Sequence, residues 1–378
     1  MPSTLMLLSN PHRPDPRVLI EARALREAGY EVRLIAWDRE GKWAPEAREG
    51  PIEVLRLGPK CPARDPLRIM ARLPRFWLRA LKVARRLEFD FVHAHDLDTL
   101  PLGMAISNLS GKPLLYDAHE LYSKMIENEV GPLARPMWIW ERNCAGRANE
   151  VITVSEALAS ELSGRRARKP RVVTTSQSTD ALTGANISDI RGKYGLRGFV
   201  VSYLGSLEPG RFVEEYISSF GPQDHVTLIV GGSGTLEGAV SKAALHNPAL
   251  KYIGTVDTDE ALRITWASDM VLAMMDPSNP NNVVGTPGKM INAMAVGRPV
   301  LTTIGLNISK KIEEADAGIA IPWDKGAFVE AVLKAAADPE RLKKMGKNGK
   351  EFYDQQFSWE KSKSELIKAY QALQAQRP

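Results

Sequence analysis

Short apolar runs alternate with amphipathic segments along this chain, and the alternation passes through the sequence twice. In the first half, apolar runs predict buried strands at residues 4–9, 31–37, 52–57, 89–94, 113–117, 151–154 and 172–174. In the second half, they predict strands at residues 199–205, 226–231, 250–254, 270–274, 299–302 and 318–320. Helical spacing of apolar residues predicts helices at residues 16–29, 67–87, 213–220, 259–266, 289–296 and 327–336. This alternation indicates parallel β-α units, and it predicts an α/β fold with doubly wound sheets.

The length of the chain predicts more than one domain. It has 378 residues, and single hydrophobic cores stop growing at about 250–300 residues. We therefore expect two similar Rossmann-like halves facing one another, at residues 1–180 and 181–356, with a closing segment at residues 357–378. The polar stretch at residues 176–198 is the expected linker.

Several classes of protein are disfavoured by composition. Cys61 and Cys144 are the two cysteines, too few for a disulfide framework. The chain has neither C-x-x-C nor H-E-x-x-H, so we expect no zinc site. Its N-terminus lacks the basic and apolar regions of a secretory signal, and no segment approaches the about 20 apolar residues of a membrane span. We expect a cytoplasmic protein without a bound metal or other cofactor.

The net charge of +5 comes from an excess of basic residues in the first half. Cations are concentrated in the predicted helix at residues 67–87, namely Arg68, Arg72, Arg75, Arg79, Lys82, Arg85 and Arg86. Such a helix suits the anionic inner face of a membrane, although an ordinary amphipathic helix with a charged outer face explains it equally well. No recognised nucleic-acid-binding module accompanies the charge.

A glycine-rich turn follows a predicted strand of the second half, at the strand end where doubly wound sheets bind ligands. The turn after residue 230 reads GGSGTLEG, in which Gly232 and Gly234 fit a dinucleotide fingerprint but Glu237 stands in place of its third glycine. This weakens the prediction of NAD binding. The turn still suits a phosphate at a helix start, and a plain tight turn remains an equal alternative.

The segment at residues 279–301, NPNNVVGTPGKMINAMAVGRPVL, is the most informative. Gly288 and Lys289 begin its predicted helix, whose N-terminus offers unpaired N–H groups and a partial positive charge. Arg211, after the strand that ends at Gly205, is a second cation on the ligand side of the sheet. Together they predict a site for a diphosphate, and the alternative is that both are solvated surface charges.

The chain resembles the retaining GT-B glycosyltransferases, in particular the large family 4. Its matching segments are DPRVLIEARALREAGYEV (residues 15–32), HAHDLDTLP (93–101), YDAHELY (116–122), VITVSEAL (151–158), YLGSLEPGR (203–211), PGKMINAMAVGRPVL (287–301) and FSWEKSKSELIKAY (357–370). This resemblance implies a GT-B fold with a central cleft. It also implies that the helix at residues 357–378 packs back on the N-terminal domain.

Each domain has a role that the resemblance implies. The N-terminal domain would bind a glycan or glycolipid acceptor, and the C-terminal domain would bind the nucleotide sugar without a metal. The implied catalytic residues are His119, Arg211 and Lys289. Donor binding falls to Gly205, Gly232, Pro287, Gly288, Asn292 and Asn282, and acceptor binding to Arg17, His95 and Glu120. At least one of His93 and His95 is expected to be structural.

The sequence departs from the family pattern where two glutamates eight residues apart are common. Val284 takes the first place and Asn292 the second, with Asn281 and Asn282 as candidates to replace the first. The expected reaction is transfer of a sugar from a UDP- or GDP-linked donor to a hydroxyl, with retention. Three alternatives remain open: a UDP-sugar epimerase, a non-catalytic protein that binds nucleotide sugars, and a membrane-surface adaptor.

Overall fold

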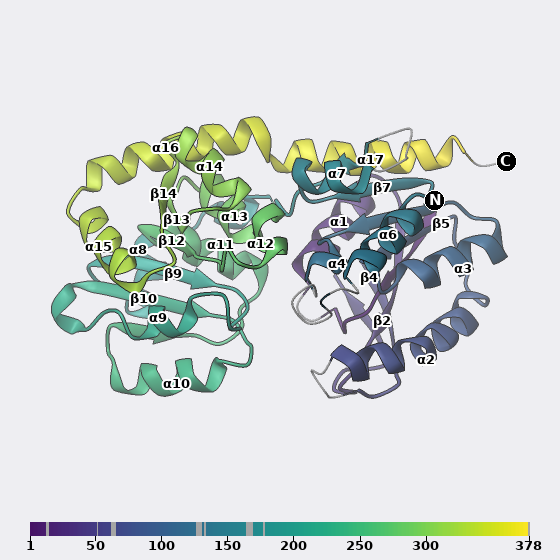
Figure 1. Cartoon of the computed structure of the whole chain (residues 1–378), viewed down its shortest axis with the longest axis horizontal. Helices are drawn as coiled ribbons and strands as arrows, with labels where there is room; N and C mark the ends of the chain where they lie inside the picture. Colours follow the sequence, from purple (N-terminus) through teal and green to yellow (C-terminus); the bar gives the residue numbers. More distant parts are fainter. Residues whose placement is uncertain are drawn as a thin grey trace. The chain divides into compact units, whose positions relative to one another are not determined.

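The computed structural model describes residues 1–12, 15–50, 52–61, 66–125, 131, 134–163, 169–176 and 178–376 (Figure 1). The chain divides into two compact units. Unit 1 comprises Met1–Thr174 and Glu360–Pro378, and unit 2 comprises Thr175–Trp359. Unit 1 is therefore discontinuous in sequence, because its last segment follows the whole of unit 2.

Unit 1 contains an eight-stranded sheet. Its strands, in order across the sheet, are β3 (Glu46–Glu49), β4 (Ile52–Leu57), β2 (Glu31–Trp37), β1 (Ser3–Leu8), β5 (Phe91–His95), β6 (Leu114–Ala118), β7 (Glu150–Thr153) and β8 (Arg171–Val172). The pairings are parallel except for that of β3 with β4 at one edge. The strands therefore end together along one side of the sheet, as a doubly wound fold requires.

Helices cover both faces of this sheet. Alternate residues of β5 point to opposite faces, as in any strand. Ala94 lies against Gly103 of α3 (Leu100–Ser110), whereas Phe91 and His93 contact Tyr370 of α17 (Trp359–Gln374) on the other face. The remaining helices of the unit are α1 (Pro16–Glu27), α2 (Pro66–Ala84), α4 (Tyr122–Met125), α6 (Ala134–Ala145) and α7 (Glu156–Ser163).

Unit 2 contains a six-stranded, parallel sheet. Its strands, in order, are β11 (Leu250–Tyr252), β10 (Val226–Gly231), β9 (Phe199–Leu204), β12 (Met270–Ala273), β13 (Val300–Thr303) and β14 (Gly318–Ile321). The helices are α8 (Ile187–Tyr194), α9 (Val213–Ile217), α10 (Glu237–His246), α11 (Thr258–Ala267), α12 (Pro280–Val284), α13 (Gly288–Ala295), α14 (Asn307–Glu314), α15 (Lys325–Ala336) and α16 (Pro339–Gln356). The prediction of two Rossmann-like α/β sheets is confirmed.

The apolar runs of unit 2 supply a core on each face of its sheet. On β9, Val200 joins a cluster with Ile229 and Ile264. Val201 and Tyr203, also on β9, join a larger cluster on the other face of the sheet. Strands buried on both faces read as continuous apolar runs, which explains why these strands could be predicted from sequence.

Two elements differ from the sequence predictions. Strand β3 was not predicted, because its sequence EARE has no apolar alternation and it is half exposed at the sheet edge. Part of the predicted linker is helical, since α8 occupies Ile187–Tyr194. Its signals are present in the sequence: Asn186 caps its N-terminus and Gly195 ends it with φ at 62°.

The basic helix α2 ends at Ala84, three residues before the predicted end. Among the described residues, no helix combines the length and the apolarity that crossing a membrane needs.

Candidate functional site

The candidate site of unit 1 lies where β5 and β6 end. His95 is the last residue of β5, and His119 follows the last residue of β6. Both rings meet Asp117, a fully buried residue of β6: His119 Nε2 lies 2.8 Å and His95 Nδ1 lies 3.2 Å from Asp117 Oδ2. The two imidazoles also contact each other, at 3.2 Å between His95 Nδ1 and His119 Nε2.

His119 lies between two carboxylates. Its Nδ1 is 3.2 Å from Asp96 Oδ2, and its backbone N–H donates to Asp96 Oδ1 at 3.0 Å. Asp96 has φ at 62°, a left-handed conformation that is strained for a non-glycine residue. Its side chain is 32% exposed, against 17% for His119 and none for Asp117. Asp96 is therefore the carboxylate of this group that solvent or a ligand reaches most easily.

The members of this group shift one another's pKa values, and burial raises the pKa of Asp96 to about 7. Burial lowers the pKa of His119, but the carboxylates of Asp96 and Asp117 outweigh it and raise this pKa to about 10. Burial also acts to raise the pKa of Asp117, but Arg17 and His119 hold it well below its usual range. His119 is therefore an imidazolium at neutral pH, and it cannot act as a base.

Arg17 holds Asp117 from the other side. Its Nε and Nη2 donate to the two oxygens of Asp117 at 2.8 Å and 2.6 Å, and its Nη1 donates to the carbonyl of Val173 at 2.7 Å. Its Nη2 also lies 3.1 Å from Glu21 Oε1. The structure places Arg17 and His95 beneath the surface, although the sequence pattern associates both with the acceptor. Glu120 lies in the bend after His119 and is half-buried.

Glu21 and His93 extend the cluster into the core. His93 Nδ1 lies 3.0 Å from the hydroxyl of Tyr370, and His93 Nε2 lies 3.7 Å from Glu21 Oε2. Burial raises the pKa of Glu21 to about 8. It also lowers the pKa of His93 well below its usual value, and that of His95 to a lesser degree. Both imidazoles are therefore neutral at pH 7.

The candidate site of unit 2 gathers two cations from different elements. Lys289, from the first turn of α13, places its Nζ 3.9 Å from the centre of the Tyr203 ring. Burial, with the nearby charge of Arg211, lowers the pKa of Lys289 well below its usual value. Within the described ranges, neither cation has a carboxylate at ion-pair distance. An anionic ligand would supply the counter-charge for this pair and would favour the charged form of Lys289.

Asn282 positions Arg211 in this site. Its Oδ1 accepts from Arg211 Nη1 at 3.2 Å, and its Nδ2 donates to the carbonyl of Asp276 at 2.8 Å. The side chain is 5% exposed, so its amide is committed to protein partners. The geometry therefore gives Asn282 the role of holding the guanidinium of Arg211.

Gly205 and Gly232 let two backbone segments approach each other. A Cβ at Gly232 would lie 1.8 Å from the carbonyl oxygen of Gly205, and Gly232 has φ at 136°. The N–H of Gly232 donates to the carbonyl of Gly254, and that of Gly205 to Gly231. Close packing thus explains both glycines. A Cβ at Gly205 would also lie 2.8 Å from Lys289 Nζ, so its absence leaves room for this ammonium.

The N-terminus of α13 has no side-chain cap. Pro287 is the N-cap residue, and its carbonyl accepts from the N–H groups of Met290 and Ile291. Asn292 lies one turn after Gly288 and Lys289, on the same side of the helix. Its Oδ1 is buried and accepts no hydrogen bond from any described residue. An uncapped helix start, a lysine and an amide acceptor therefore share one face.

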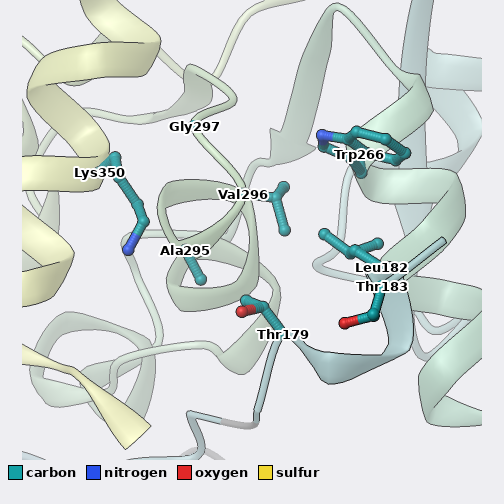
Figure 2. Close-up of a pocket in the computed structure, with 8 residues that line it drawn as sticks. All are labelled: Thr179, Leu182, Thr183, Trp266, Ala295, Val296, Gly297 and Lys350. Atoms are coloured by element: carbon teal, nitrogen blue, oxygen red, sulfur yellow. The ribbon is translucent and has the colours of Figure 1, made fainter. Parts of the chain in front are cut away.

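A cavity of about 420 Å³ lies at the opposite end of α13 (Figure 2). Ala295, Val296 and Gly297 line it where the helix ends, and Lys350 of α16 borders it. Figure 2 shows Trp266 and Leu182 on its other side. Because Lys289 begins the same helix, this cavity is separate from the two cations.

The sequence patterns did not predict every residue that contacts the predicted site residues. Asp96, Asp117 and Tyr203 were not among the predicted site residues, although each contacts one that was. The sequence D-x-H at Asp117 and His119 places both at one strand end, and this spacing is the signal that could have identified Asp117.

Two family models of glycosyltransferases match this chain, one in each half. A family described as Glycosyltransferase Family 4 matches residues 17–179. One described as Glycosyl transferases group 1 matches residues 199–338. A D-inositol 3-phosphate glycosyltransferase from Gordonia bronchialis is 25% identical to this chain, over 92% of it and 81% of the relative.

Solved structures resemble the chain along its whole length. Sucrose-phosphate synthase from Thermosynechococcus elongatus superposes with a TM-score of 0.77 at 19% identity, covering 99% of both chains. Anabaena HepE in complex with UDP-glucose superposes with a TM-score of 0.72 at 18% identity, covering 98% of this chain and 99% of the other. At these identities the likeness shows the fold.

Proposed function

Because the chain belongs to family 4 of the GT-B glycosyltransferases, we propose that it transfers a hexosyl group from a nucleotide-sugar donor to a hydroxyl acceptor. The observation that carries this proposal is the pair of cations, Lys289 and Arg211, beside the uncapped start of α13. Unit 2 binds the donor and unit 1 the acceptor. A uridine nucleotide is the first candidate, supported by the UDP and UDP-glucose bound to HepE.

Departure of the diphosphate is the step that unit 2 assists. As the bond from the anomeric carbon to the phosphate oxygen breaks, negative charge grows on the diphosphate. Lys289, Arg211 and the free N–H groups of α13 stabilise this charge with fixed donors, the role that a metal ion has in other transferases. Asn292 Oδ1 accepts from a ribose hydroxyl, in place of the glutamate that is common in the family.

The acceptor side depends on the charged group of unit 1. His119 cannot remove a proton, because both its ring nitrogens bind carboxylates. We assign His119 and Arg17 to positioning, and Asp96 to binding the acceptor hydroxyl as the most exposed carboxylate of the group. The proton of the acceptor passes to the departing phosphate oxygen, which agrees with transfer with retention.

Helix α2 supports peripheral contact with an anionic membrane. Phe76 and Ala80 are fully buried and fix the helix on unit 1, and Phe76 stacks on Trp37 at 5.3 Å. Its cations are exposed, as are Met70 and Leu78, at 44% and 61%. Apolar side chains among cations suit a membrane surface, and an acceptor carried by a lipid would be presented there.

Donor binding tests the proposal directly. Thermal unfolding of the purified chain is measured with UDP, GDP, ADP and their sugars, in the absence of metal. A ligand at 100 times its Kd stabilises by about 2.7 kcal/mol, so one nucleotide should raise the Tm clearly. The variant Lys289→Ala should lose the rise, and Lys343→Ala, an exposed lysine on α16, should keep it.

Turnover separates the remaining alternatives. A transferase releases nucleotide from its sugar faster when an acceptor hydroxyl is added, whereas an epimerase converts the donor with no acceptor. Binding without either reaction would support the non-catalytic alternative. No rise in Tm with any nucleotide would refute the proposed donor site.

A further inference from the structure

Two histidines and a glutamate converge beneath the candidate site of unit 1. His93 and His95 are two residues apart on β5, so both rings lie on one face of the sheet. The rings stack with centroids 4.2 Å apart. Glu21 reaches them from α1, and one potential ligand atom each from Glu21, His93, His95 and Asp117 lies within 4.8 Å of all the others.

Four buried atoms of this cluster have no hydrogen-bond partner among the described residues. They are both carboxylate oxygens of Glu21 and the Nε2 atoms of His93 and His95. The guanidinium of Arg17 lies 3.1 Å from one of these oxygens, as an ion pair without hydrogen-bond geometry. Buried polar atoms in proteins nearly always have partners, so this cluster of potential ligand atoms has unused acceptor capacity that a bound cation would satisfy.

The other nitrogen of each ring is already held. His95 Nδ1 lies 3.2 Å from Asp117, whose carboxylate can only accept. With the proton of His95 on Nδ1, the lone pair is on Nε2, which is buried and has no hydrogen-bond partner among the described residues. His93 Nδ1 contacts the Tyr370 hydroxyl at 3.0 Å. Histidines that bind metals are held in this way by a second partner.

We propose that Glu21, His93 and His95 bind one divalent transition-metal ion, for which Zn²⁺ is the best fit. Two imidazoles and one carboxylate are a common donor set for zinc and poorly suit Mg²⁺ or Ca²⁺. Zinc holds such atoms at about 2.0–2.2 Å, so binding draws these side chains together. Asp117 and Tyr370 position the two rings.

The metal would have a structural role. Its ligands come from α1 and β5, and the His93 ring also contacts Tyr370 of α17. One ion therefore joins three elements of unit 1, including α17. It stabilises this unit and takes no part in departure of the diphosphate, which is assigned to unit 2.

Metal content is the first test. The full chain, without a histidine tag, is refolded from denaturant with Zn²⁺ or Co²⁺, because the ligands are buried, and is then desalted. Mass spectrometry of the metal should find about one Zn²⁺ per chain, and the Co²⁺ form should absorb visible light. Glu21→Gln and His95→Gln should lose the metal. The matched control His246→Gln, at an exposed histidine on α10, should retain it.

Stability is the second test, and it is independent of activity. Protein refolded with Zn²⁺ should have a higher Tm than protein refolded with EDTA, and this difference should vanish in Glu21→Gln. Circular dichroism establishes that the variant is folded. If the wild-type chain binds neither Zn²⁺ nor Co²⁺ and its Tm is the same with and without these metals, the proposal is overturned. Glu21 is then a buried neutral acid. Nucleotide binding by unit 2 is unaffected in either case.

Discussion

At the scale of single residues, Asn282 is a buried amide whose contacts show how unit 2 orders a cation. It bridges Arg211 and the carbonyl of Asp276. Asn282→Ala should free the guanidinium and weaken nucleotide binding by about tenfold or more, since a hydrogen bond to a charged group contributes about 1.5–3 kcal/mol. Calorimetric titration with the nucleotide found by the thermal screen measures this. Asn348→Ala, on α16, is the control, and an unchanged Kd in Asn282→Ala would contradict the positioning role.

His119 makes stability depend on pH. Its pKa is about 10 in the folded protein, above the ordinary 6.5. A raised pKa stabilises fully below the unfolded value, so this contribution should decline as pH rises above 6.5 and be lost by about pH 10. Thermal unfolding at pH 6 to 10 should therefore show a steeper fall in Tm for the wild type than for His119→Gln. Parallel curves would show that His119 is not an imidazolium.

Both the backbone conformation of residue 232 and its close contact with Gly205 require a glycine there. In Gly232→Ala, the new Cβ would meet the carbonyl of Gly205 at a φ of 136°. We expect a loss of about 3 kcal/mol or more in the free energy of unfolding. Gly238 in α10 has open space around it, so Gly238→Ala should be neutral or stabilise by up to about 1 kcal/mol. Urea unfolding of both variants tests the contrast.

The residues of the candidate sites could be predicted only in part. Lys289, Arg211 and His119 occupy family motifs that can be read from the sequence. Asp96 and Tyr203 could not be assigned, because their roles arise when separate strand ends meet in the folded sheet. The four unpartnered atoms around Glu21 depend on the packing of α1 against β5, which no spacing in the sequence reveals.

At the scale of elements, burial decides which segments can be predicted. The interior strands could be read from their apolar runs. Strand β3 could not, because a half-exposed edge strand needs no apolar face. Helix α8 was obscured by its polar sequence, of which Ile190 is the one buried residue.

Helix α2 should bind anionic vesicles in proportion to its charge. Arg75→Glu with Lys82→Glu should reduce vesicle binding about tenfold or more, since each cation near such a surface contributes about 1 kcal/mol. Sedimentation with vesicles of anionic lipid measures binding. The control, Lys343→Glu with Lys347→Glu on α16, changes the net charge equally. If both double variants bind alike, the attraction is not specific to α2.

At the scale of the whole molecule, the two units differ in whether they are continuous. Unit 2 runs from Thr175 to Trp359 and has its own cores on both faces of its sheet. A fragment of these residues should fold alone and unfold cooperatively. Residues 1–174 alone should not, because Tyr370 and Leu373 of α17 are fully buried in unit 1. Circular dichroism and thermal unfolding of both fragments check this, and a stable fragment 1–174 would contradict it.

The late position of α17 in the sequence also has a consequence for synthesis. A ribosome completes residues 175–359 before it makes the helix that unit 1 needs. Unit 2 can therefore fold while the chain is still growing, whereas the sheet of unit 1 keeps the surface around Phe91 uncovered until α17 has been made. Chaperones would be needed most during this interval, and a ribosome that stalls before α17 is complete would leave one finished domain joined to one that cannot fold.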